Sequence, residues 1–150
     1  MSTRAAGGPA VVVLLLLALL LGACGTVKEP DPEDWDETAR VSLTDAASEV
    51  SAVKLTLVHA RSDDLWRSYA VVVLADAEEA VGKAEDKVTV LQPPPARTKV
   101  ADKVANLLAT ASDVVGKARQ SYVASHRVED QLLHRLDVLA GRLEHQAKAL

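Results

Sequence analysis

The chain has 150 residues, a length that is typical of one domain and argues against two. Apolar residues make up 49% of it, but the aromatic fraction is only 3%, and neither Phe nor Ile occurs. This aliphatic composition suits closely packed helices and argues against a β-sandwich or β-barrel. Charged residues make up 25% and the net charge is −4, which excludes disorder along the whole chain.

An uninterrupted apolar run occupies residues 10–21, and Arg4 places a positive charge ahead of it. The run is too short for a membrane-spanning helix, which needs about 20 residues. Its length matches the apolar segment of a secretory signal peptide. The sequence therefore predicts that residues 1–23 are a signal peptide.

Cys24, the single cysteine of the chain, directly follows Leu21, Gly22 and Ala23. These four residues resemble the lipobox of bacterial lipoproteins, and the resemblance covers residues 1–25 only. It implies that lipoprotein signal peptidase recognises Leu21, Gly22 and Ala23, and that a lipid-modified Cys24 becomes the mature amino terminus. It also implies lipid anchoring on the extracytoplasmic face of the cell membrane, but no particular activity. The alternative is an ordinary signal peptide with a coincidental cysteine, although a lone thiol in an exported protein has no internal disulfide partner.

Residues 24–30 form the expected lipidated terminus and tether, and acidic side chains dominate residues 26–37. Two interpretations of these acidic residues are open. In the first, they repel anionic lipid head groups and hold the domain clear of the membrane. In the second, which we favour, Asp31 caps a helix that begins with Pro32, and the following carboxylates complement the helix dipole.

Residues 31–150 are expected to form the folded domain, because apolar residues recur there in steps of three and four, as in amphipathic helices. Three prolines at 93–95 mark one break. Cations followed by acids near residues 62 and 125 mark two more. The sequence therefore predicts helices at about 32–60, 63–91, 96–120 and 126–149, arranged as an antiparallel up-down-up-down four-helix bundle. The alternative is a long two-helix antiparallel coiled-coil hairpin, because neither charge-marked turn contains Gly or Pro.

No constellation of catalytic or metal-binding residues stands out in the sequence. The Glu-x-x-His pairs of di-iron bundles are missing, and His134 and His145 lie about 16 Å apart along one helix face, too far to share an ion. There is no Gly-x-Ser-x-Gly nucleophile turn and no glycine-rich phosphate loop. Residues 38–150 are electrically neutral overall, which argues against a nucleic-acid partner. We therefore expect no enzyme activity, no catalytic residue, no cofactor and no metal.

Three aromatic residues, Trp66, Tyr69 and Tyr122, are predicted to meet at one end of the bundle. The interpretation we favour is an aromatic plug that closes this end of the aliphatic core. The alternative is an exposed patch that binds a partner or an apolar ligand.

These observations together predict a lipid-anchored, extracytoplasmic protein with a non-enzymatic role in interaction or envelope structure. Its membrane contact is the lipid on Cys24, and the sequence identifies no protein partner. The competing hypothesis is a helical-bundle carrier of a small ligand, haem or a metal ion.

Overall fold

The computed structural model describes residues 31–150. The predicted signal peptide, the lipobox and the tether lie outside the described part of the chain. Four long helices and one short 3₁₀ turn follow one another: α2 (Pro32–Arg61), α3 (Arg67–Thr89), η1 (Pro95–Arg97), α4 (Thr98–Ser125) and α5 (Asp130–Ala147).

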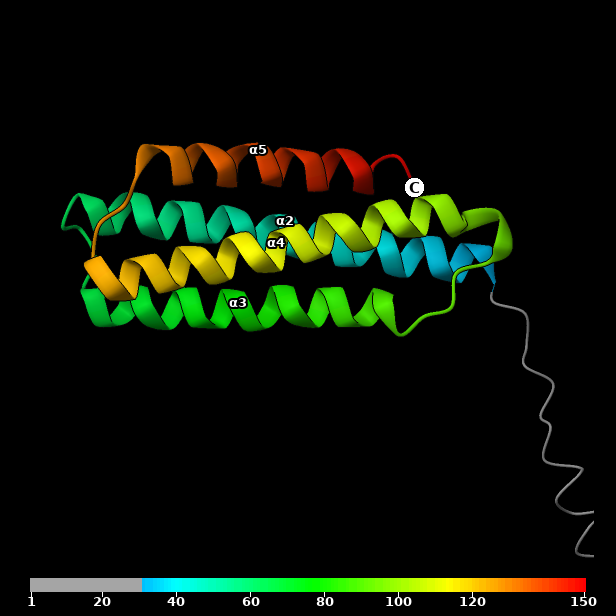
Figure 1. The fold of residues 1–150 in the computed structure, drawn as a ribbon, viewed down its shortest axis with the longest axis horizontal. Coiled ribbons are helices and arrows are strands. Elements are labelled where there is room, and N and C mark those ends of the chain that lie inside the picture. The colour runs from blue at the N-terminus through cyan, green and yellow to red at the C-terminus, as the bar shows by residue number, and fades with distance from the viewer. Residues whose placement is uncertain (1–30) are drawn as a thin grey trace, which may run out of the picture.

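Successive helices run in opposite directions, as Figure 1 shows. This arrangement confirms the predicted antiparallel four-helix bundle and excludes the two-helix hairpin, because α2 ends at Arg61 and α5 is a separate helix from Asp130. Residues 31–150 contain no β-strand. Within the same residues, no helix combines the length and the apolar character needed to cross a membrane.

The start of α2 has the cap that the favoured interpretation of the acidic segment predicts. Asp31 has an extended backbone, and its side chain accepts a hydrogen bond from the Glu33 N–H at 2.9 Å. Pro32 occupies the first helical position, where its missing N–H removes no helical hydrogen bond. The cap therefore determines the residue at which the bundle begins.

The two turns without Gly or Pro contain residues in the left-handed backbone region. Asp63 has a φ of 57° and His126 a φ of 52°, and Asp and His adopt this region more readily than most side chains. The His126 N–H also donates to the Tyr122 carbonyl at 2.8 Å and so closes the last turn of α4. Helices α2 and α4 therefore end without a glycine.

Several helix boundaries differ from the predicted ones. Helix α3 begins at Arg67 rather than at 63, and α5 begins at Asp130 rather than at 126, because residues 62–66 and 126–129 form the turns. Helix α4 continues to Ser125 rather than ending at 120, because Tyr122 on its last turn packs into the core. At both sites where cations are followed by acids, the acidic residues thus lie in the turn or at the first position of the next helix.

The core is aliphatic and receives side chains from every helix. The predicted stripe on α2 is buried along most of its length, with Leu43, Val50 and Leu57 at 0% exposure, and is only partly buried at Ala60 near the helix end. The largest fully buried side chains are Tyr122, Leu43, Leu57, Leu74, Leu108, Leu136 and Leu143.

Helix α2 is the centre of the assembly. It packs against α3 on one side and α5 on the other, and α3 packs in turn against α4. Helices α4 and α5 touch each other at few points. The bundle is therefore open along the side between α4 and α5.

Polar contacts between helices follow the same pattern. Among residues 31–150, ion pairs and hydrogen bonds join α2 to α5, α2 to α3, η1 to α2 and α3 to α4, but none joins α4 to α5. The pairs that link different elements are Lys54–Asp137, Arg61–Asp130, Lys87–Asp45, Arg97–Asp36, Arg119–Glu78 and Ser112–Glu85.

Candidate functional site

The residues predicted for lipidation and peptidase recognition, Cys24, Leu21, Gly22 and Ala23, lie outside the described residues. The candidate site of the described chain is on the open side of the bundle, between α4 and α5.

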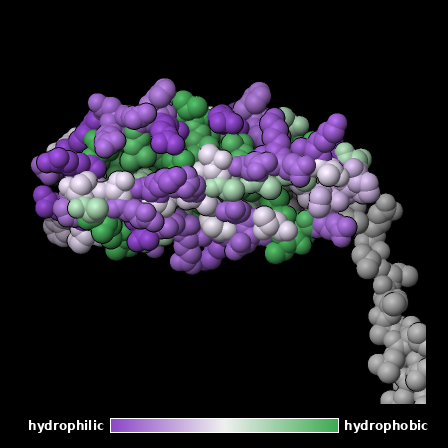
Figure 2. All heavy atoms as spheres, viewed as in Figure 1, coloured by the Kyte–Doolittle hydropathy of each residue, from purple (hydrophilic) through white to green (hydrophobic). Residues whose placement is uncertain are grey.

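Two adjoining hollows of about 670 Å³ and 310 Å³ lie between these two helices. Both are lined by Thr110, Val138 and Arg142, so they form one continuous groove, the α4/α5 groove. In Figure 2, apolar surface lies between the hydrophilic edges of the two helices. The groove is therefore an apolar strip with polar borders.

The apolar floor of the groove comes from both helices. Leu107 and Val114 of α4 are 7% and 6% exposed, and Leu139 of α5 is 4% exposed. Val138 is a large apolar side chain that is 46% exposed within the groove. An occupant that covered Val138 would remove apolar surface from water, which is favourable.

Positive charge surrounds this floor. Lys103 of α4 and Arg135 and Arg142 of α5 line the groove, and no carboxylate of residues 31–150 lines it. None of the three cations forms an ion pair with a carboxylate of the described chain. The groove therefore has an unbalanced positive charge that suits an anionic occupant.

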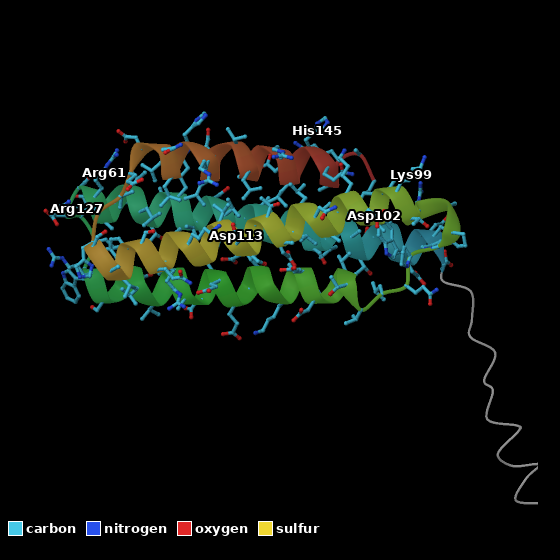
Figure 3. The ribbon with its side chains drawn as sticks, viewed as in Figure 1. Arg61, Lys99, Asp102, Asp113, Arg127 and His145 are labelled. Atoms are coloured by element: carbon cyan, nitrogen blue, oxygen red, sulfur yellow. The ribbon has the colours of Figure 1, made fainter. Side chains whose placement is uncertain are left out.

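Two carboxylates adjacent in sequence to groove residues, Asp113 and Asp137, form ion pairs outside the groove. Asp113 of α4, labelled in Figure 3, accepts a hydrogen bond from Lys117 at 2.6 Å. Asp137 of α5 accepts one from Lys54 of α2 at 2.5 Å. The Lys54 hydrogen bond and positive charge hold the pKa of Asp137 below its ordinary value of 3.8. Asp137 therefore pairs with α2, and it is not among the residues that line the groove.

Two further residues indicate unfilled space and an unmet polar contact in the groove. A Cβ added to Gly141 would meet no atom within 4 Å, so the surface beside α5 is open at this point. Gln146 is only 5% exposed, and its Oε1 has no hydrogen-bond partner in the described chain. A buried amide oxygen without a partner is unfavourable and uncommon in folded proteins.

A third hollow, of about 510 Å³, lies between α2 and α5 and differs from the groove in its charge. Its two cations are Arg40, which pairs with Glu37 at 2.6 Å, and Lys148, which lies 3.9 Å from Glu144. The hydroxyls of Thr44, Ser48 and Ser51 along its wall bond to backbone carbonyls of their own helix. This hollow therefore has no unpaired cation to attract a ligand.

The aromatic residues do not form the predicted plug. Tyr122 is 2% exposed and packs edge-on against His126, with ring centroids 5.6 Å apart. Trp66 is 84% exposed and Tyr69 is 57% exposed. Trp66 is the N-cap residue of α3 and therefore lies outside the helix. The helical spacing that placed the three aromatic residues at one end of the bundle did not predict the direction of the Trp66 side chain. The exposed pair fits the alternative interpretation, a surface patch.

His134 and His145 lie apart along α5, as their spacing in the sequence predicts. His134 and His145 lie on one face of α5, where both line the groove, but they belong to different hollows. Within residues 31–150, no three His, Cys, Asp or Glu side chains gather closely enough to hold a metal ion.

Sequence reasoning did not identify the groove. A signal was present: Lys103, Asn106 and Thr110 recur on α4 at the spacing of the buried stripe, and polar residues recur likewise on α5. Two helices that face each other with a polar row beside the apolar row cannot pack closely along their whole length. The pattern predicts a groove only once the packing of α4 and α5 is known.

No family model, no curated protein and no solved structure matches the chain.

Proposed function

We propose that this protein is a lipoprotein anchored through Cys24 to the extracytoplasmic face of the cell membrane, where it acts by binding another molecule rather than by catalysis. The proposed location rests on the resemblance of residues 1–25 to a signal peptide with a lipobox. The binding role rests on one observation above all, the α4/α5 groove with exposed Val138 and three cations that form no ion pair in the described chain.

The direction of the chain fits such an anchor. Residues 24–31 span at most about 25 Å when extended, and α2 begins at Pro32 at one end of the bundle (Figure 1). Helix α2 has 30 residues, which corresponds to a length of about 45 Å. An anchored bundle therefore presents its sides and its far end to partners, and the groove lies on one of those sides.

Anchoring is tested with Cys24→Ser in cells. We expect wild type in the membrane fraction with a mass that includes the lipid, and the variant either unprocessed or released from the membrane. Ala23→Leu is a second variant, which leaves the thiol in place and should block cleavage. A wild-type protein that is soluble and carries no lipid would disprove the anchor.

A carrier of a small ligand is the second candidate, and the partnerless Oε1 of buried Gln146 in the groove is the observation that favours it. Small-molecule sites usually enclose most of their ligand, and a groove that leaves Val138 nearly half exposed encloses less. Thermal unfolding of the full chain with haem, Cu²⁺, Zn²⁺ or lipid separates the two candidates. A stoichiometric stabilisation by one of these ligands would favour the carrier.

A further inference from the structure

The charge of the α4/α5 groove is spread along its length. Arg135 and Arg142 are two helical turns apart on α5, about 10 Å at the rise of an α-helix. Lys103 lies on the opposite border, and both Lys103 and Arg142 line the larger hollow. A ligand with a single anionic head group would pair with one part of this array and leave the rest unpaired.

The dimensions of the groove correspond to a few turns of helix. Its lining on α4 runs from Lys103 to Val114, which spans about 17 Å. It is open to solvent along this length, since Asn106, Thr110, Val138 and Arg142 are all exposed. Open apolar grooves between helices are a recurring docking mode for amphipathic helices, which insert apolar side chains at positions i, i+3, i+4 and i+7.

We propose that the α4/α5 groove binds an acidic amphipathic helix of a partner protein. The apolar face of that helix covers exposed Val138 and packs on the edges of the nearly buried Leu107 and Val114. Its flanking carboxylates pair with the cations of both borders. The buried amide of Gln146, whose Oε1 has no hydrogen-bond partner in the described chain, also lines the groove. The inference rests on the proposed binding role and adds the location and chemistry of the partner.

Photo-crosslinking with the full chain, in the cells that make it, tests this inference. A benzophenone amino acid replaces Gly141 in the groove or, as the matched control, Gly82 on α3. Both positions accept a side chain, because a Cβ added at either one meets no atom within 4 Å. We expect a protein adduct from position 141 and none from position 82. Peptide sequencing of the adduct should identify a segment with apolar residues at helical spacing, flanked by Asp and Glu.

Charge reversal tests the role of the cations in the same assay. Arg135→Glu with Arg142→Glu should lower the yield of the position-141 adduct about tenfold or more, because paired charges then become repulsive. Arg67→Glu with Arg127→Glu makes the same change in net charge outside the groove and should leave the yield within about twofold, since neither residue lines it. Circular dichroism of each variant checks that the helices remain folded.

Four results would overturn the inference: no adduct at position 141, an adduct of lipid mass, an adduct with a second copy of this chain, or a partner segment without acidic flanks. Placing the benzophenone at position 69, three residues from exposed Trp66, tests the other exposed surface. A protein adduct obtained only there would support a binding role for the protein but would disprove the groove as the binding site. Membrane fractionation of Cys24→Ser is measured separately. Failure of the lipid-anchor proposal can therefore be distinguished from failure of the proposal that the groove binds a partner.

Discussion

Lys54 Nζ of α2 lies 2.5 Å from Asp137 Oδ1 of α5, and a second pair, Arg61–Asp130, joins the same two helices at 2.5 Å. Helix α5 is therefore attached to the bundle mainly on its α2 side. Its neighbouring face, with Arg135 and Arg142, borders the groove and carries no ion pair to α4 within residues 31–150. Because α5 packs mainly on α2, its side toward α4 stays open and forms the groove.

Asp137→Asn should loosen α5, because it removes the charge that Lys54 pairs with. The lowered pKa of Asp137 sets the sign of the pH dependence. Its stabilising contribution is present above the ordinary carboxyl value of 3.8 and is lost as the pH falls through the lowered value. Urea unfolding should therefore separate variant from wild type at neutral pH and show no difference once the carboxyl is protonated.

Glu79→Gln is the control for Asp137→Asn, because Glu79 pairs with Lys83 within α3 and joins no helices. Amide hydrogen exchange should accelerate across α5 in Asp137→Asn and stay unchanged there in Glu79→Gln. Equal exchange in both variants would mean that apolar packing alone holds α5.

Gly141→Ala should raise the free energy of unfolding by about 0.5–1 kcal/mol, since glycine disfavours a helix interior by about this amount relative to alanine. The added Cβ meets no atom within 4 Å at Gly141 or at Gly82, so Gly82→Ala should behave alike. At Gly116 the Cβ would lie 3.2 Å from Glu78 Oε1, so Gly116→Ala should gain less or lose stability. Thermal or urea unfolding compares the three, and a destabilised Gly141→Ala would contradict an open groove at that point.

Tyr122→Ala should lower the free energy of unfolding by about 3–5 kcal/mol, as expected when a large buried aromatic side chain is truncated. Trp66→Ala should change it by less than about 0.5 kcal/mol, because an exposed side chain makes little contact. Their exposed fractions are 2% and 84%. Similar losses in both variants on urea unfolding would revive the aromatic plug.

Ser42→Ala should leave stability unchanged or raise it, because the Ser42 Oγ is buried without a hydrogen-bond partner in the described chain. Ser112→Ala is the matched comparison, since its hydroxyl donates to Glu85 at 2.5 Å and joins α4 to α3. We expect that variant to lose about 1 kcal/mol. Urea unfolding measures both, and a loss in Ser42→Ala that equals the loss in Ser112→Ala would imply a partner for Ser42.

Local features of the sequence predicted the elements well. The steps of three and four from Leu43 through Ala46, Val50 and Val53 to Leu57 predicted a buried stripe, and the structure buries all five completely. The Asp31-Pro32 pair predicted the start of α2, because capping depends on neighbouring residues alone. The switches from cations to acids located both turns without Gly or Pro, although they placed the next helix starts too early.

The sequence by itself determined four amphipathic helices, their order and the motif around Cys24, because these depend on spacing and on adjacent residues. The tertiary structure decided which helix faces meet. It buried Tyr122 while leaving Trp66 and Tyr69 in solvent, and it joined α5 to α2 rather than to α4. The groove exists for the same physical reason: Lys103 and Arg142 border one groove only because α4 and α5, although consecutive in the chain, pack mainly on other helices and leave an open seam between them.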